Sequence, residues 1–334
     1  MRIRYALFAL ITLILLPLSV AAEGDDPLVP PSQPLFGPGG MATTYPEVEA
    51  RRFGEAPHGF WIFRPAPIPD DATPLPIVVF LHGYTQLDPE AYRAWIDHIV
   101  KRGAVVIYPD YQDEEHLGAD FEMVADTAAE AVQRAVGLLV ATDQPVDASR
   151  ITLVGHSVGG ILSVLLADQS RYPDLPPAEV IFSVQPGGCR DCGNTPEGAG
   201  VPIPPTLILP EDSALVFLTG DADLVVGTSG AAALWPVTDE LQRRAWVTVP
   251  SDVHGDPPLV SDHLLAETLG PNAKINAHDW MGTWGVLDQL MLCASEGGAC
   301  EAVLRNEPFA IDLGEWSDGT PVNPIMVWPS PPEA

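Results

Sequence analysis

The stretch 151-ITLVGHSVGG-160 decides the fold. The run 151–154 is mostly apolar and β-branched, and it leads into a serine that lies between two glycines. Such a run is typical of a strand buried on both faces, and the residues from Val158 onward have the spacing of a helix. Gly155 and Gly159 leave room for a very tight turn at Ser157 between the two elements. The Gly-x-Ser-x-Gly pattern alone is weak evidence for a nucleophile, so its meaning depends on the rest of the chain.

On both sides of this stretch, buried strands alternate with helices. The runs "LPIVVFLHGY" (75–84) and "AVVIYPDY" (104–111) predict strands, and the spacing of apolar residues predicts helices over 91–103 and 118–142. Further strands are predicted in "AEVIFSVQPGG", "ALVFLTGDADLVV" and "RRAWVTVPSDVHG". This alternation predicts an α/β fold with a mostly parallel central sheet and helices on both faces. In such a sheet, ligands bind beyond the carboxyl ends of the strands.

Polar residues follow the predicted strands at those ends. Ser157 comes directly after the strand predicted at its own stretch. Asp223 follows the strand predicted in "ALVFLTGDADLVV", and His254 follows the last predicted strand, in "RRAWVTVPSDVHG". A serine hydroxyl is a poor nucleophile until a base takes its proton, and an imidazole base needs a carboxylate to fix its tautomer. The sequence therefore predicts a catalytic triad with Ser157 as nucleophile, His254 as base and Asp223 as acid.

The order Ser157, Asp223, His254, with "GHSVGG" on a strand–turn–helix and "FLHGY" on an early strand, resembles the α/β-hydrolase superfamily. The resemblance covers roughly residues 60 to 270. "LTGDADLVV" is similar to the acid loop of the superfamily, and "SDVHGDP" is similar to its histidine loop. The resemblance implies that the backbone N–H groups of Tyr84 and Val158 form the oxyanion hole, and that no cofactor is needed.

Other residues compete for two of these roles. His263 and His278 also follow the acid, but "SDHLLAETL" favours a helix in which His263 has a surface or packing role, and His278 begins a helix-like segment. We expect His254 to be the base because it alone directly follows a strand. Asp221 and Asp212 are the alternatives for the acid.

Within the superfamily, the chain resembles compact secreted ester hydrolases of the dienelactone-hydrolase, chlorophyllase and cutinase kind. The resemblance implies a serine hydrolase that cleaves a carboxylic ester, small or lipid-like, through an acyl-enzyme. The chain contains no long insertion, so we expect no large cap domain. Two alternatives are open: an acyltransferase or cofactor-free perhydrolase with the same triad, and a non-catalytic binding module with this fold.

The N-terminus predicts export. Two arginines precede an apolar run that ends in small residues, which is typical of a secretory signal peptide at 1–22. A retained membrane anchor is the alternative. Residues 23–45 are rich in Pro and Gly and predict a linker. We expect one domain over 46–334 with a C-terminal extension after about 270, in a secreted or periplasmic protein without stable membrane insertion.

The four cysteines predict two disulfides in an exported protein, with Cys189 bonded to Cys192 and Cys293 bonded to Cys300. A redox or zinc role for "CRDC" is the alternative. The sequence contains no EF-hand loop or HExxH pair, and no GxGxxG follows a strand, so we expect neither a metal nor a dinucleotide.

The net charge and the C-terminal extension bear on the partners and on the substrate pocket. The net charge of −29, from 45 acidic and 16 basic residues, disfavours binding to nucleic acid. We expect a monomer. Gln86, Trp280 and Trp284 are candidates for the wall of the substrate pocket, although the spacing of the two tryptophans also fits a packed helix face. Asp318-Gly319 predicts a hairpin turn, and the extension could cover the acyl pocket or brace the sheet.

Overall fold

The computed structural model describes residues 27–69, 72–113, 121, 123–142, 145–193, 195–269, 274–296 and 303–332. The predicted signal peptide and Cys300 lie outside the described residues. None of the helices in the described ranges is long and apolar enough to cross a membrane.

A single sheet carries the fold, with the strand order β1-β2-β4-β3-β5-β6-β7-β8-β10-β9 in the described chain. The six strands β4, β3, β5, β6, β7 and β8 are parallel neighbours, and antiparallel strands lie at both edges. The strands are β1 Glu47–Phe53, β2 Phe60–Ala66, β3 Leu75–Leu81, β4 Val105–Pro109, β5 Val146–His156, β6 Ala178–Val184, β7 Ala214–Gly220, β8 Arg244–Val249, β9 Phe309–Ile311 and β10 Ile325–Trp328. The mostly parallel sheet is confirmed.

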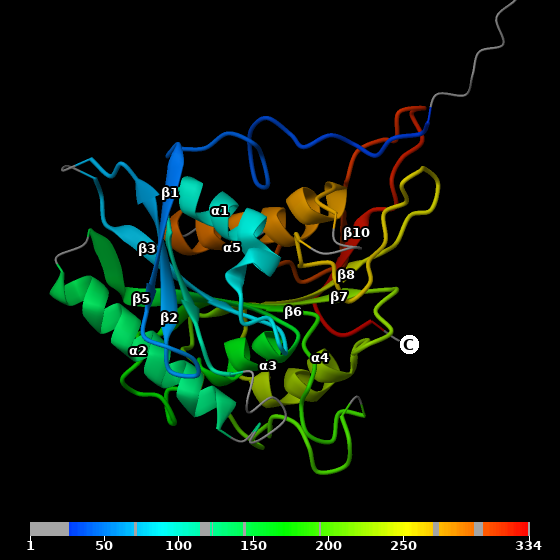
Figure 1. Cartoon of the computed structure of the whole chain (residues 1–334). Helices are drawn as coiled ribbons and strands as arrows, with labels where there is room; N and C mark the ends of the chain where they lie inside the picture. Colours follow the sequence, from blue (N-terminus) through cyan, green and yellow to red (C-terminus); the bar gives the residue numbers. More distant parts are fainter. Residues whose placement is uncertain are drawn as a thin grey trace, which may run out of the picture.

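Helices cover both faces of this sheet (Figure 1). One face carries α1 and α5, and the other carries α2, α3 and α4. The helices are α1 Arg93–Lys101, α2 Val124–Ala141, α3 Val158–Leu165, α4 Ser229–Leu234 and α5 Trp284–Glu296, with short 3-10 turns η1 Pro89–Tyr92 and η2 Trp235–Thr238 and a π-helical turn η3 His278–Thr283. The α/β-hydrolase layout expected from the sequence is therefore confirmed.

Strand β3 shows why the central strands are continuously apolar. Ile77 and Val79 pack into the core beneath α2 and α3, whereas Val78 and Phe80 pack into the core beneath α1 and α5. All four side chains are fully buried. Because successive side chains of a strand point to opposite faces, a sheet covered on both faces requires apolar residues at every position.

The C-terminal extension braces the sheet. Its strand β10 pairs antiparallel with β8, and β9 pairs with β10. The Asp-Gly turn lies where it was predicted, since the backbone N–H of Trp316 donates to the carbonyl of Thr320 and Gly319 has a φ of +83°. The extension thereby continues the sheet beyond β8.

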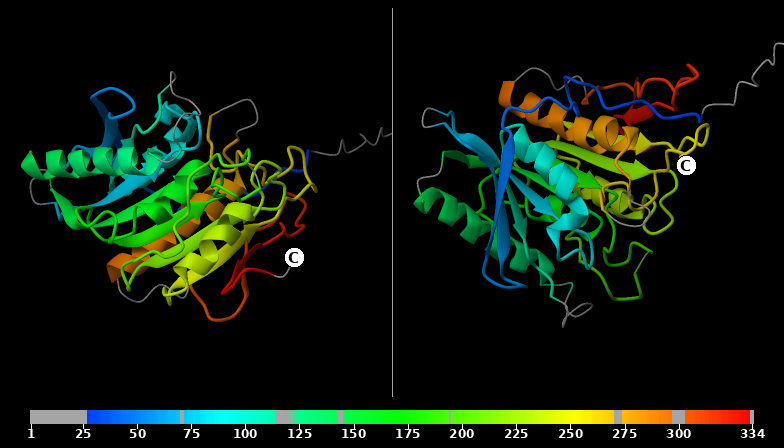
Figure 2. Two further views of the ribbon diagram at one scale, coloured as in Figure 1. Left: turned by 90° about the horizontal axis from the view of Figure 1, so that it is seen from below. Right: turned by 45° about the horizontal axis from the view of Figure 1, so that its top comes forward.

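The described part of the Pro- and Gly-rich segment, residues 27–45, has no regular secondary structure but lies along the C-terminal extension (Figure 2). The carbonyl of Val29 accepts a hydrogen bond from the N–H of Ser317, and the N–H of Gly39 donates to Asp288 over 2.7 Å. These contacts hold the segment against the domain.

Two sequence expectations about elements differ from the structure. "SDHLLAETL" forms turns rather than a helix. Strands β1 and β2 were not predicted. The edge strand β1 is largely exposed and its sequence EVEARRF has no continuous apolar run. In β2, Arg64 and Pro65 follow an apolar run of only four residues.

Candidate active site

Ser157 lies in a strained turn between β5 and α3. Its φ of +57° is in a region that non-glycine residues rarely adopt, as expected for a nucleophile held on a strand-to-helix turn. The turn requires small neighbours. A Cβ at Gly155 would lie 1.9 Å from the carbonyl oxygen of Gly159, and a Cβ at Gly159 would lie 2.0 Å from the carbonyl oxygen of Leu81.

His263 is the imidazole that reaches this serine. Its Nε2 lies 3.0 Å from the Oγ of Ser157, and its Nδ1 lies 2.9 Å from Oδ2 of Asp223. Because a carboxylate accepts, Nδ1 carries the proton and Nε2 is free to accept from the serine hydroxyl. This is the hydrogen-bond order that a general base needs.

Asp223 is set up to stay ionised. One oxygen accepts hydrogen bonds from the backbone N–H groups of Val225 and Val226, both over 3.0 Å, and the other faces His263. Burial by itself raises the pKa of this carboxyl, but the hydrogen bonds from His263 and from the two backbone N–H groups outweigh it and hold the pKa below its ordinary value. The alternative Asp221 instead accepts from the hydroxyl of Ser251.

The structure does not bring His254 to the serine, which corrects the predicted base. The Nε2 of His254 lies 2.9 Å from Oδ2 of Asp318, and its ring packs edge-on against Trp316. These partners belong to the hairpin of the C-terminal extension. The third candidate, His278, is fully buried beside Ser261.

The path of the chain after β8 explains the error. Asp252 and Leu259 pair as an antiparallel bridge, so residues 253–258 form an excursion that leaves the sheet and returns. His254 lies in this excursion, and His263 follows its return. The pattern "GDPP" (255–258) is typical of a turn and was the signal in the sequence that could have indicated the excursion.

Two buried side chains, Gln185 and His156, hold the backbone around the candidate base His263. We call residues 261–267 the base loop. Gln185, directly after β6, donates to the carbonyl of Asp262 over 2.6 Å and to Asp223 over 3.1 Å. His156, at the end of β5, contacts the carbonyl of His263 over 2.9 Å. The base loop is thus positioned by side chains from the ends of two central strands.

The two predicted oxyanion donors lie next to the nucleophile turn and in the loop after β3. We call residues 82–86 the oxyanion loop. Within the described residues, the backbone N–H groups of Val158 and Tyr84 make no hydrogen bond. Val158 begins α3, and the first N–H groups of a helix have no intrahelical acceptor. Both groups therefore remain open to a ligand oxygen, and their catalytic role stays a prediction.

The three pocket candidates have different surroundings. The amide of Gln86 donates to Glu267 over 3.0 Å, which connects the oxyanion loop to the base loop. Trp284 is only 5% exposed and packs against His98 in the core. Trp280 is partly buried and packs against the same hydrophobic core cluster, and its backbone lies directly against Gly39 of the N-terminal segment. For the tryptophans, the structure therefore supports the packed helix face and corrects the pocket-wall prediction.

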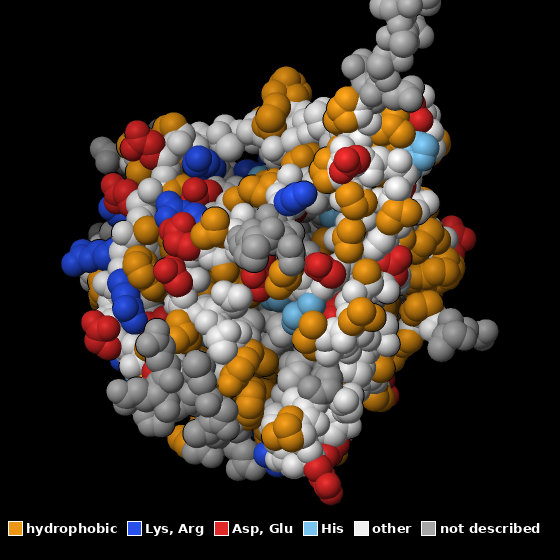
Figure 3. Space-filling view, turned by 45° about the vertical axis from the view of Figure 1, so that its right-hand side comes forward, with side chains coloured by type: hydrophobic (Ala, Val, Ile, Leu, Met, Phe, Trp, Pro, Cys, Tyr) orange, Lys and Arg blue, Asp and Glu red, His pale blue; other side chains and the backbone are white. Residues whose placement is uncertain are grey.

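The surface near the acid is apolar. Leu224 is 96% exposed and Val225 is 63% exposed, directly after Asp223, and Tyr84 of the oxyanion loop is 40% exposed. Figure 3 shows a face on which hydrophobic and acidic side chains gather around exposed histidine, with few basic side chains among them. Such a surface suits a neutral ligand better than an anion.

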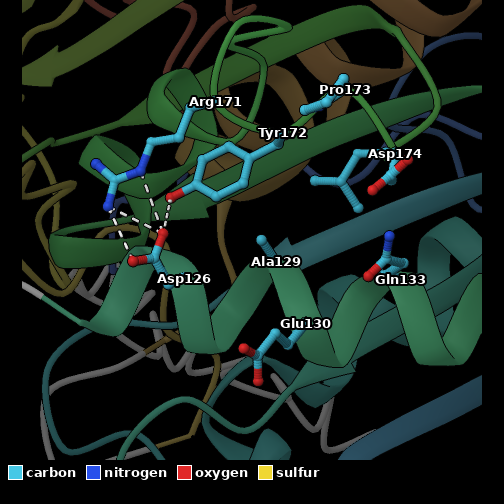
Figure 4. Close-up of a pocket in the computed structure, with 9 residues that line it drawn as sticks. Asp126, Ala129, Glu130, Gln133, Arg171, Tyr172, Pro173 and Asp174 are labelled. Carbon is cyan, nitrogen blue, oxygen red and sulfur yellow. Dashed lines mark hydrogen bonds and ion pairs between the residues drawn. The ribbon is translucent and has the colours of Figure 1, made fainter.

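A cleft of about 220 Å³ lies away from the triad, between α2 and the segment after α3 (Figure 4). Its Arg171 is held by both carboxylate oxygens of Asp126, and the hydroxyl of Tyr172 donates to the same carboxylate. Because the arginine is already paired, this cleft does not offer it to a ligand.

The cysteines partly follow the expectation. Cys189 and Cys192 form a disulfide, which does not fit a zinc role for "CRDC". Cys293 is buried, and its predicted partner Cys300 lies outside the described residues. In the described chain, no group of three or more His, Cys, Asp or Glu side chains could hold a metal ion.

Two of three comparisons with known proteins found a similar protein. The model of the Chlorophyllase family matches residues 32–192, just under half of the chain, a span that includes Ser157. No curated protein matches the sequence. Among solved structures, one of two fungal esterases from Rhizomucor miehei is similar, with 16% identity, a TM-score of 0.53, and coverage of 77% of this chain and 87% of that chain. The chain therefore has a fold similar to that of an esterase, and its residues 32–192 are similar to the Chlorophyllase family.

Proposed function

We propose that this protein is an exported serine esterase that hydrolyses carboxylic esters through an acyl-enzyme, with Ser157, His263 and Asp223 as its triad. The observation that carries the proposal is the position of His263, which hydrogen-bonds Ser157 through one ring nitrogen and Asp223 through the other. The similarity to the Chlorophyllase family over residues 32–192 and to a fungal esterase supports ester hydrolysis.

The first half of the reaction forms the acyl-enzyme. Nε2 of His263 takes the proton of the Ser157 hydroxyl while the oxygen attacks the acyl carbon, and Asp223 stabilises the imidazolium that results. The carbonyl oxygen becomes an oxyanion, which the N–H groups of Val158 and Tyr84 stabilise. When the tetrahedral intermediate collapses, the alcohol leaves with the proton from His263.

The second half repeats these steps with water. His263 takes a proton from a water molecule, the hydroxide attacks the acyl carbon, and Ser157 leaves with the proton from His263. The acid product is released and the enzyme returns to its starting state.

Further features of the chain support the export and the substrate class. The signal-like sequence at 1–22 and the Cys189–Cys192 disulfide are typical of proteins that leave the cytoplasm. The exposed Leu224 and Val225 and the net charge of −29 favour an ester without negative charge.

A fluorophosphonate probe tests the proposal. The full chain should be labelled on one serine, and Ser157→Ala should abolish both labelling and hydrolysis of p-nitrophenyl butyrate. Ser163→Ala is the matched control, because Ser163 lies on α3 and its hydroxyl donates to the carbonyl of Gly160. Equal labelling of Ser157→Ala and of the unaltered chain would overturn the proposal.

A further inference from the structure

A buried chain of hydrogen bonds connects the oxyanion loop to the base loop. The N–H of Gly83 donates to the hydroxyl oxygen of Tyr92 over 2.9 Å, and that hydroxyl lies 2.9 Å from Nδ1 of His156. The Nε2 of the same ring lies 2.9 Å from the carbonyl oxygen of His263. Tyr92 is fully buried and His156 is only 1% exposed.

The N–H of Gly83 at one end of these hydrogen bonds and the carbonyl of His263 at the other determine where every proton between them lies. The carbonyl of His263 can only accept, so Nε2 of His156 carries the ring proton. Nδ1 then has a free lone pair, and the hydroxyl of Tyr92 donates to it. The oxygen of Tyr92 in turn accepts from the N–H of Gly83. Each group has one role, and no proton is free to move to another partner.

The hydrogen bonds between Gly83, Tyr92, His156 and His263 keep these proton positions across the working pH range of an esterase. Burial, with a smaller contribution from His263, lowers the pKa of His156 to about 3. Burial also raises the pKa of the Tyr92 hydroxyl far above its ordinary value. A second proton on His156 would leave Nδ1 and Tyr92 as two donors facing each other, so the neutral ring is the form that fits.

We infer that Tyr92 and His156 are positioning residues that hold the base loop against the oxyanion loop, so that His263 and the oxyanion donors keep a fixed separation. This inference rests on the proposed triad. Gly83 directly precedes Tyr84, and the carbonyl at the other end belongs to His263 itself, so the link reaches the backbone at both parts of the site. In the base loop, turns replace a regular helix, and buried side chains supply the contacts that hold it.

Variants of His156 that keep one polar atom at a time test its hydrogen bond to Tyr92 and its hydrogen bond to the His263 carbonyl separately. In His156→Gln, the amide nitrogen stands near the place of Nε2 and can still donate to the carbonyl of His263. In His156→Asn, the amide oxygen stands near the place of Nδ1 and can still accept from Tyr92, but the contact with the base loop is lost. Tyr92→Phe removes the oxygen that joins Gly83 to His156 and keeps the ring.

The test measures kcat and KM for p-nitrophenyl butyrate, the rate of fluorophosphonate labelling and the melting temperature. We expect Tyr92→Phe and His156→Asn to lower kcat by about 10- to 100-fold with KM changed by less than about threefold, because a displaced base slows the chemical step. His156→Gln, which leaves the hydroxyl of Tyr92 without its acceptor at Nδ1, should lower kcat by a similar factor. Tyr172→Phe, which removes a tyrosine hydroxyl from the remote cleft of Figure 4, should leave kcat unchanged.

The outcomes distinguish the link from the proposed function. If the parent chain is not labelled, the proposed function fails. If the parent is labelled and both His156→Asn and Tyr92→Phe keep the parent's kcat, only the link is overturned. A parent-like kcat in His156→Gln together with a loss in His156→Asn would also overturn it, because the contact with Tyr92 would then have no role. If Tyr92→Phe does not fold, the kcat values of His156→Gln and His156→Asn still test the link.

Discussion

The Nε2 of His254 lies 2.9 Å from Oδ2 of Asp318, which ties the excursion after β8 to the hairpin of the C-terminal extension. The pKa of Asp318 is lowered to about 2, first by the backbone N–H of Thr320 and then by His254. Both side chains are about one-third exposed. This histidine therefore has a structural partner at the surface and is not part of the triad geometry.

We predict that His254→Ala leaves catalysis almost unchanged. Because exposed ion pairs contribute little to stability, kcat/KM should stay within about twofold of the parent and the melting temperature should fall only slightly. Initial rates with p-nitrophenyl butyrate and a thermal melt check this. A loss of kcat comparable to that of Ser157→Ala would return His254 to the site.

His263→Ala should give the opposite result. Without an imidazole between Ser157 and Asp223, nothing in the site can take the serine proton, and kcat should fall by at least about a thousandfold. Fluorophosphonate labelling should slow in parallel. The melting temperature should fall modestly, because the side chain is only 13% exposed and hydrogen-bonds the buried carboxylate of Asp223. Labelling at the parent's rate would contradict the assignment.

Ser157 and Asp223 were predictable because each follows a buried strand with little intervening chain. Apolar runs such as those of β5 and β7 identify the strand, and parallel topology then places the next polar residues at one edge of the sheet. His263 was not predictable in this way. Thirteen residues separate it from the end of β8 at Val249, and the Asp252–Leu259 bridge that returns the chain to the site is a tertiary contact.

Contacts between residues far apart in the sequence were unpredictable for the same physical reason. The contact of Gly83 with Tyr92, and of His156 with His263, joins residues far apart in the sequence, and no local pattern encodes it. Strands β9 and β10 have only three and four residues, so their apolar runs are too short to indicate strands by themselves.

Glycine substitutions should separate the nucleophile turn from an ordinary helix position. Gly159→Ala would place a Cβ 2.0 Å from the carbonyl oxygen of Leu81, a backbone atom that cannot move away cheaply. We expect this variant to lose more than about 3 kcal/mol of stability, and with it the labelling of Ser157. Urea unfolding measures the change.

Gly137→Ala is the matched control for that variant. Gly137 lies in α2, where a Cβ would meet no atom within 4 Å. Alanine is the better helix former by about 0.5–1 kcal/mol, so this variant should be more stable than the parent and fully active. Similar stability losses in both variants would show that the crowding at the nucleophile turn is not the cause.

Glu267→Gln should change how the stability of the fold depends on pH. Burial raises the pKa of Glu267, although Gln86 and His263 lower it in part. A carboxyl with a raised pKa destabilises the fold as pH rises through that pKa, so the variant should melt higher than the parent at pH 8 and similarly near pH 4. Glu130→Gln, on α2, removes a carboxylate whose side chain is 68% exposed and should show no such difference. Equal melting temperatures of Glu267→Gln and the parent at pH 8 would contradict the prediction.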